Sequence, residues 1–470
     1  MGAASPVLGD TAAPPAARIG VYPLLLLLFG SAVAAAHAGL GEALRPVFPV
    51  ASMAAGAWLL WTGRKTDYLV FVLWLFMLTP GLRRVTDLQA GWLQVNLVML
   101  APYTASVVSI GPVLQGMLRR GFAYSGLFAI VLACTAYGLV LATVENRLYA
   151  GSFEALRWTT PACLGFLVAM ETEDQAGLRA AVVRTMLVAL CVLPAYGLYQ
   201  FVSAPAWDVL WMRESKLLSI GLPEPFRIRV FGTMNSPASL ASFLMAGLLW
   251  VIPSRLAARP LAMGAGLVVL LLTLVRTAWL GLVVGGVFLV LFGASARVRF
   301  NIVAGVACFP LLIGVVEQIP DVAEVTAARI ASLSDVANDA SFRDRASDYA
   351  EFFEVLLPRT PFGVGLGISG SYQTYLDQRV SKVMDGAIME IGVSLGVFVG
   401  GAFLLTILAT ACIACWNSLR GDDSFLSSCG AIVAALTLSL AAGNIAVGET
   451  GVLFWVAAGF CLARTGPARP

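Results

Sequence analysis

Charge is scarce in this chain of 470 residues. Only 12% of the residues are Asp, Glu, Lys or Arg, while 59% are hydrophobic, and soluble domains carry roughly 25% charged residues. So little charge cannot cover a water-exposed surface, which argues against a soluble enzyme with a tail anchor, a single-span receptor and a disordered chain. A β-barrel is disfavoured too, because its strands alternate apolar and polar residues, whereas this chain runs in solid apolar blocks.

Histidine is nearly absent, and cysteine is absent from the long polar segments. The single His37 cannot form a cluster, which excludes zinc hydrolases and nucleophiles activated by His. All eight Cys fall inside or at the ends of apolar runs, away from the segments where an oxidising compartment would form disulfides. Cys412 and Cys415 form a lone C-x-x-C, which we interpret as helix packing. We expect no metal and no cofactor, so any chemistry rests on Arg, Asp, Glu, Lys or Tyr.

The apolar runs predict an all-α polytopic membrane bundle of about 14 (12–14) transmembrane helices, since one helix spans ~20 residues. The N-terminal runs are 20–37, 46–62, 68–82, 95–112, 124–143, 157–170 and 182–203. The later runs are 237–253, 260–276, 278–293, 300–317, 387–415, 429–444 and 449–463.

The short loops predict the orientation. Placing both termini in the cytoplasm makes nearly every short inner loop basic, for example at Arg64-Lys65 and Arg119-Arg120, and leaves Arg83 and Arg84 as the exception. The predicted divisions are a flexible cytoplasmic tail 1–19, transmembrane helices 20–203, an outer loop 204–236, transmembrane helices 237–317, a large outer loop 318–386, C-terminal transmembrane helices 387–463 and a cytoplasmic tail 464–470.

Several cations and one carboxylate lie where a membrane protein seldom places them. Arg227 and Arg229 precede Phe231-Gly232-Thr233, and they either contact solvent and headgroups or point at an anionic group. Arg276 separates two apolar runs and is either a functional Arg at membrane depth or one that snorkels to the interface. Glu390 lies just inside an apolar run, where it either functions or pairs with an Arg. Trp207 and Trp211 are expected to be interfacial anchors.

The loop 318–386 is too long to lack structure of its own. Ser341-Phe342-Arg343-Asp344 resembles a capping box, and it opens a predicted amphipathic helix, carrying Arg343 and Arg345, that runs to about Leu357 before Pro358. Pro361-Phe362-Gly363-Val364-Gly365-Leu366-Gly367 follows a helix and not a strand, so we expect its glycines to permit a tight backbone turn and not a dinucleotide loop.

The order of these elements resembles the O-antigen ligase and O-antigen polymerase family of bacterial membrane glycosyltransferases. The resemblance covers about 227–400 and rests on Arg229-Val230-Phe231-Gly232, Arg276-Thr277-Ala278-Trp279, the glycine-rich turn and Asp385-Gly386-Ala387-Ile388-Met389-Glu390.

The resemblance implies a glycosyltransferase at the periplasmic face of the inner membrane, in the biosynthesis of lipopolysaccharide or exopolysaccharide. The donor would be a glycan linked to polyprenyl diphosphate, and the acceptor a glycan or a lipid, with membrane lipid and other polysaccharide-assembly proteins as partners and no nucleic acid. Arg229 and Arg276 match the family's arginine positions and would stabilise the diphosphate leaving group. Arg227, Arg343 and Arg345 are further candidates for binding the diphosphate.

One departure from the family concerns the acceptor. The ligase branch has His followed by Asn at the start of the span after the large loop, and here that position reads Asp385-Gly386. A polymerase, or a ligase-like transferase with another acceptor, therefore remains open, with Asp385 as general base and Glu390 as the second candidate. The rival functions are a transporter or flippase of a lipid-linked glycan, a cell-wall synthase and a non-enzymatic scaffold.

Overall fold

The computed structural model describes residues 20–120, 122–171, 173–217, 220–293, 296–303, 314, 340–368, 386–420, 423–441 and 443–463. Within these ranges the chain is helical, with one isolated antiparallel bridge between Gly221 and Ile228, which confirms the all-α prediction for this part of the chain. The predicted tails 1–19 and 464–470 lie outside the described residues, as do most of the run 300–317 and the loop segments 318–339 and 369–385.

The N-terminal helices are α1 (Val21–Ala35), α2 (Gly41–Trp61), α3 (Lys65–Ala90), the short η2 (Leu97–Leu100), α4 (Ala101–Val107), α5 (Ile110–Arg120), α6 (Phe122–Val144), α7 (Leu148–Met170), α8 (Gln175–Ser203) and α9 (Ala206–Glu214). The later helices are α10 (Pro237–Val251), α11 (Arg259–Leu272), α12 (Arg276–Phe292), α15 (Ala340–Glu351), η5 (Phe352–Leu356), α16 (Leu357–Arg359), α17 (Ala387–Ser418), α18 (Ser424–Leu438) and α19 (Gly448–Leu462).

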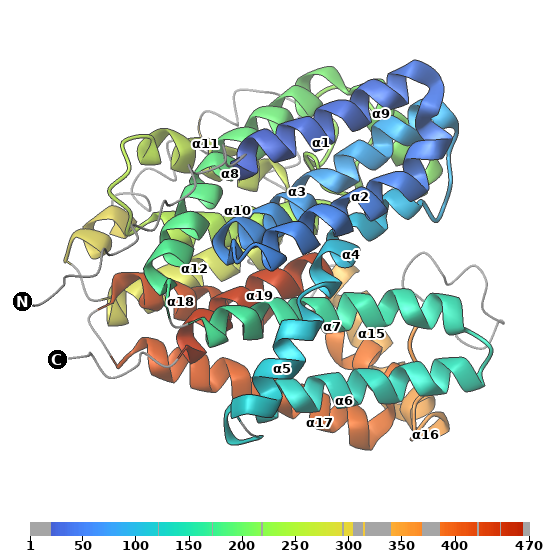
Figure 1. Cartoon of the computed structure of the whole chain (residues 1–470), viewed down its shortest axis with the longest axis vertical. Helices are drawn as coiled ribbons and strands as arrows, with labels where there is room; N and C mark the ends of the chain where they lie inside the picture. Colours follow the sequence, from blue (N-terminus) through green and yellow to red (C-terminus); the bar gives the residue numbers. More distant parts are fainter. Residues whose placement is uncertain are drawn as a thin grey trace, which may run out of the picture.

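Among the described residues, seven helical segments are long and apolar enough to cross a membrane, and α10, α11, α12 and α19 are shorter apolar helices. The first segment, Val21–Trp61, contains both α1 and α2, which are joined at Gly39 (φ 80°) and lie side by side (Figure 1). The run 95–112 is divided into η2, α4 and α5, where Pro102 and Pro112 each occupy a first helical turn. The membrane bundle is thus borne out, while the number of 14 crossings stays a prediction.

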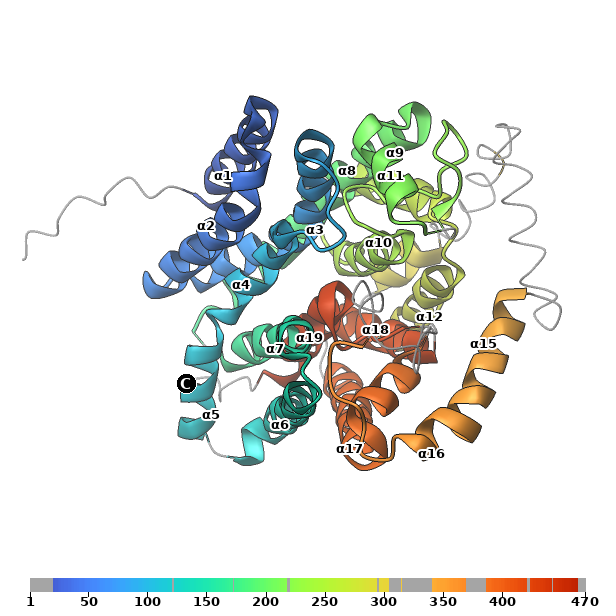
Figure 2. The ribbon, with the colours of Figure 1, turned by 90° about the vertical axis from the view of Figure 1, so that its right-hand side faces the viewer.

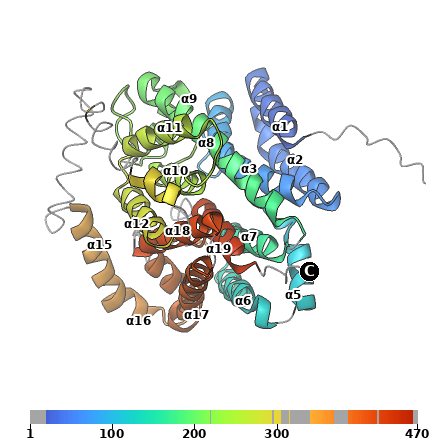
Figure 3. The ribbon, with the colours of Figure 1, turned by 90° about the vertical axis from the view of Figure 1, so that its left-hand side faces the viewer.

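α19 lies near the middle of the bundle, against α7, α18 and α17 (Figures 2 and 3). The approach of α7 to α19 depends on Gly165 and Gly459, because a Cβ at Gly165 would lie 2.8 Å from the Trp455 carbonyl carbon and one at Gly459 would overlap the Gly165 carbonyl oxygen. Small residues permit such close helix packing inside a membrane, where there is no hydrophobic drive between helices.

The helix α17 is broken at Gly396 (φ 77°, ψ −175°). The segment Pro361–Gly367 fits into the break: the N–H groups of Val364 and Gly365 donate to the Val393 and Ser394 carbonyls at 2.9 Å. Val397 N–H donates in return to the Pro361 carbonyl at 2.9 Å. A buried backbone group must find such a partner within the protein.

The glycines of this segment adopt the conformations that the sequence analysis expected. Gly363, Gly365 and Gly367 all have positive φ, and a Cβ on Gly363 would lie 2.6 Å from the Gly396 backbone nitrogen. The helix before the segment begins at Ala340 and ends at Arg359, two residues beyond the predicted end, because Pro358 occupies the first turn of α16 and does not stop the helix.

Candidate active site

Arg229 lies against the turn that carries Arg276. Its Nε donates to the Thr273 carbonyl at 3.2 Å and its Nη2 to the Leu274 carbonyl at 3.1 Å. Thr273 is the C-cap of α11 and Leu274 follows it, and carbonyls at the end of a helix lack intrahelical partners. Arg276 follows as the first residue of α12 and is half-buried. The structure therefore brings both predicted arginines to one turn, although 46 positions separate them in the sequence.

A buried ion pair holds the backbone between Arg229 and α10. Arg84 Nε lies 3.1 Å from Asp208 Oδ1, and both side chains are completely buried. Arg84 also donates from Nη1 to the Met234 carbonyl at 2.8 Å and from Nη2 to the Gly232 carbonyl at 2.6 Å. Burial raises the pKa of the Asp208 carboxyl, and Arg84 opposes that rise. Arg84 is therefore buried on a structural partner.

Gln200 completes this support from α8. Its Nε2 donates to Asp208 Oδ2 at 2.7 Å, and its Oε1 accepts from the N–H groups of Phe231 and Gly232, each at 2.9 Å. Because the Gln200 amide is buried and forms these three hydrogen bonds, it holds the turn at Phe231 and Gly232 in one geometry. Gln200 thus ties the segment that follows Arg229 to the bundle.

A second charged group surrounds Arg157 in α7. Its Nη1 lies 2.5 Å from Glu154 Oε1, and Glu390 and Tyr103 are close enough to interact with it electrostatically. A Cβ on Gly448 would lie 3.4 Å from Arg157 Nη2 and 3.6 Å from Tyr103 Oη, which places the guanidinium at the first turn of α19. Glu390 is buried (9% exposed), and its electrostatic interaction with Arg157 leaves both the functional and the pairing alternatives open.

A cavity of about 430 Å³ opens beside this group. It lies between the end of α3, the turn 91–96, the start of α7 and α9, and Arg83, Glu154, Arg157 and Glu449 contribute its charged lining. Glu154 and Arg157 were not predicted from the sequence as site residues. Their signal was an acid and a base three positions apart at the start of an apolar run, which is also the pattern of an ordinary surface pair.

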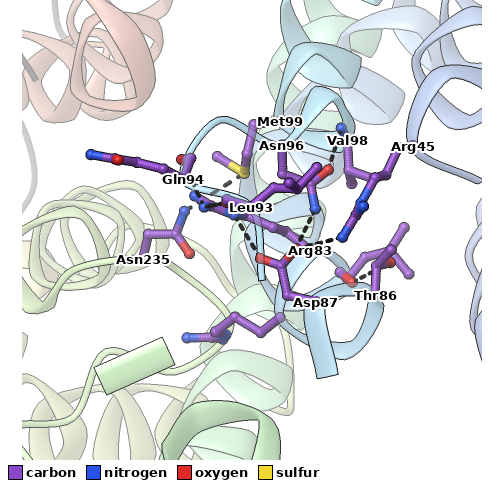
Figure 4. A network of polar contacts seen from close by, with 12 residues as sticks. Arg45, Arg83, Thr86, Asp87, Leu93, Gln94, Asn96, Val98, Met99 and Asn235 are labelled. Carbon is purple, nitrogen blue, oxygen red and sulfur yellow. Dashed lines mark hydrogen bonds and ion pairs between the residues drawn. The ribbon is translucent and has the colours of Figure 1, made fainter. Parts of the chain in front are cut away.

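Figure 4 shows the wall of the cavity that α3 provides. Arg83 Nε lies 3.2 Å from Asp87 Oδ2, and Asp87 Oδ1 accepts from Asn96 Nδ2 at 2.7 Å. Arg45, from α2, reaches the same carboxylate at 3.5 Å. This buried network positions the turn 91–96, whose Gln94 lies beside Arg83, across from Asn235 (Figure 4).

Trp211 is buried, whereas the sequence predicts it at the membrane interface. It is only 7% exposed, its ring lies 4.7 Å from the Arg83 guanidinium carbon, and it contacts Trp92 at 5.4 Å between ring centroids. The expectation of an interfacial anchor at Trp211 is wrong, because α9 turns this ring into the protein to cover Arg83.

Two of the remaining candidates are exposed. Arg227 forms an exposed ion pair with Glu224 at 3.1 Å, and Arg343 is exposed on α15. The α15 segment is attached to α17 by Phe352, which is buried with Met389 and Val393. The side chain of Arg345 and all of Asp385 lie outside the described residues.

Residues 261–405 match the model of a protein family described as O-antigen ligase. Over this segment the chain is similar to the O-antigen ligase family. The matched segment contains α11, the turn before Arg276, α12, the glycine-rich segment and the first half of α17. Arg229 precedes it and reaches it through the Thr273 and Leu274 carbonyls. No curated protein matches the chain.

The matched family implies a glycosyltransferase-type membrane enzyme that acts on lipid-linked glycans. The apolar helices agree with a bacterial membrane protein of polysaccharide biosynthesis.

Proposed function

We propose that the chain transfers or polymerises an oligosaccharide from polyprenyl diphosphate to an acceptor hydroxyl at the periplasmic face of the inner membrane. The observation that carries this proposal is the docking of Arg229 on the turn of Arg276. Two guanidinium groups at one fixed turn suit a diphosphate, because planar Arg forks bind phosphate oxygens with little reorganisation.

In the proposed reaction, the acceptor hydroxyl oxygen attacks the anomeric carbon of the donor sugar, and the bond from that carbon to the diphosphate breaks. Negative charge grows on the leaving diphosphate, and Arg229 and Arg276 stabilise it. The hydroxyl proton passes to a carboxylate, for which Asp385 is the first candidate and Glu390 the second. Glu390 is buried and interacts electrostatically with Arg157, so Asp385 is preferred.

The test is complementation of a deletion strain with Arg276→Ala, Arg229→Ala and Asp385→Asn. Loss of one fixed cation from such a site costs about 10²–10³ in rate, so we expect little long-chain surface polysaccharide with either Arg variant. Arg255→Ala is the matched control, because Arg255 is exposed in a short loop of the predicted cytoplasmic side. Normal glycan chain length and yield with Arg276→Ala would contradict the proposal.

The glycans that accumulate in the deletion strain separate the possible functions. Single repeats with no long chains indicate a polymerase, and full-length chains left on the lipid carrier indicate a ligase. Lipid-linked repeats trapped at the cytoplasmic face indicate the alternative, a transporter or flippase.

A further inference from the structure

Neither Arg229 nor Arg276 lines the cavity beside α3 and α7. Its volume of about 430 Å³ lies within the range of roughly 300–1,000 Å³ typical of small-ligand pockets. Aromatic side chains line it from three helices: Tyr103 on α4, Tyr149 and Phe153 on α7, and Trp211 on α9. Rings of this kind offer flat apolar surface against which a ligand can stack.

The charges of the cavity are already balanced within the protein. Arg83 is paired with Asp87 at 3.2 Å and also donates to the Leu93 carbonyl at 2.8 Å. Arg157 is paired with Glu154 at 2.5 Å. Because each cation has its own carboxylate, the lining has no excess positive charge for a phosphate. It suits a neutral ligand.

Two polar atoms of the lining residues favour a ligand that carries hydroxyl groups. Among the described residues, Asn235 Oδ1 and Trp211 Nε1 are buried without a hydrogen-bond partner. The first is an acceptor and the second a donor, and a hydroxyl group can serve both because it donates one hydrogen bond and accepts others. Glu449, held by Ser239 Oγ at 2.8 Å, adds a carboxylate acceptor to the same cavity.

The cavity also adjoins the segment that carries the diphosphate site. Asn235 lies six positions after Arg229, at the end of the turn that Arg84 and Gln200 hold in place. A ligand in the cavity and the proposed diphosphate leaving group would therefore both lie next to the segment from Arg229 to Asn235.

We propose that this cavity binds a neutral sugar residue of the glycan, with its ring against Trp211 and its hydroxyl groups bonded to Asn235 and Glu449. The proposal rests on the proposed function for the origin of the sugar, which belongs either to the donor chain or to the acceptor. The cavity recognises polyhydroxyl chemistry, while the turn of Arg229 and Arg276 recognises diphosphate.

Binding without turnover tests this separation. The purified full-length protein in detergent is titrated with a neutral oligosaccharide, released from the cell's surface polysaccharide by mild acid and freed of lipid, and separately with inorganic diphosphate. Ser152→Trp fills the cavity, since Ser152 lines it, and should abolish oligosaccharide binding while leaving diphosphate binding unchanged. Asn235→Leu should weaken oligosaccharide binding about fivefold, the effect of one hydrogen bond.

Val144→Trp is the matched control, because it adds the same ring at a 72% exposed position on α6 and should bind both probes normally. Arg276→Ala should lose diphosphate binding and keep oligosaccharide binding. Kinetics then assign the source of the sugar: for Asn235→Leu, a raised KM for donor indicates the donor glycan, and a raised KM for acceptor indicates the acceptor.

Equal oligosaccharide binding by wild type and Ser152→Trp would overturn the proposal, as would wild-type protein that binds diphosphate but no oligosaccharide. If the chain proves to have no transferase activity yet binds the oligosaccharide in a manner that Ser152→Trp abolishes, the sugar site stands and the proposed function fails.

Discussion

Replacing Gly396 with Ala should destabilise the protein more than any other substitution of similar size in α17. At φ 77° and ψ −175°, a side chain strains the backbone by about 1–3 kcal/mol. The new Cβ would also overlap the Phe362 carbonyl carbon and the Pro361 carbonyl oxygen and would lie 2.5 Å from the Gly363 nitrogen. Relieving that overlap moves Pro361, whose carbonyl accepts from Val397 N–H at 2.9 Å.

The total cost follows from these contacts. Losing the hydrogen bonds from Val397 and Gly365 adds about 1 kcal/mol each, so we expect Gly396→Ala to lower the free energy of unfolding by about 3–5 kcal/mol in sum. Nothing lies within 4 Å of a Cβ built on Gly401 in the same helix. Gly401→Ala should instead stabilise by up to about 1 kcal/mol through helix propensity.

The assay is thermal unfolding of both purified variants in the same detergent, followed by tryptophan fluorescence. We expect Gly396→Ala to unfold well below wild type and Gly401→Ala to unfold at or above it. Equal unfolding temperatures for the two variants would refute the reasoning, because they would show that the glycine-rich segment does not need the break in α17.

Two further predictions concern ion pairs. Arg84→Met leaves Asp208 buried without its partner and should lower the free energy of unfolding by about 3–5 kcal/mol. Adding Asp208→Asn should restore part of that stability. A double variant that is no more stable than Arg84→Met in thermal unfolding would contradict the pairing. Burial raises the pKa of Glu171, but Lys65 and the N–H groups of Glu173 and Asp174 lower it more strongly, so its pKa in the folded protein lies below the ordinary 4.5. The pair therefore stabilises the fold above pH 4.5, and this stability is lost as the pH falls through the folded pKa; Lys65→Met should flatten the acid limb of stability against pH, and an unchanged acid limb would count against the pair.

The fold could be predicted largely from apolar runs, because a helix in lipid satisfies its own backbone and needs about 20 apolar residues. The glycine-rich segment was predicted as a turn, but its partner in α17 was not. Nothing near Gly396 in the sequence indicates that an extended chain enters the helix there. The break depends on tertiary hydrogen bonds, in which the Val393 and Ser394 carbonyls accept from the N–H groups of Val364 and Gly365.

The candidate site was predicted in part for a similar reason. Arg276 could be found because it interrupts an apolar pattern, and Arg229 because it lies in a polar segment just before an apolar run and matches a family motif. Arg157 was missed because Glu390 and Tyr103, which interact with it electrostatically, come from helices far away in the sequence. An Arg that is neutralised across several helices looks in the sequence like one that pairs locally with Glu154.

The contacts of Arg229 hold its guanidinium in place before substrate binds. Two donors of its guanidinium satisfy carbonyls at the end of α11, where the helix dipole is negative and favours a cation. A guanidinium has five donors, so contact with these carbonyls is compatible with binding an anion. The carbonyls fix the plane of the group before substrate arrives, and Arg84 and Gln200 fix the backbone that follows it. A cation held in this way reorganises little when charge develops on a leaving group, which is the condition under which electrostatic stabilisation is most effective.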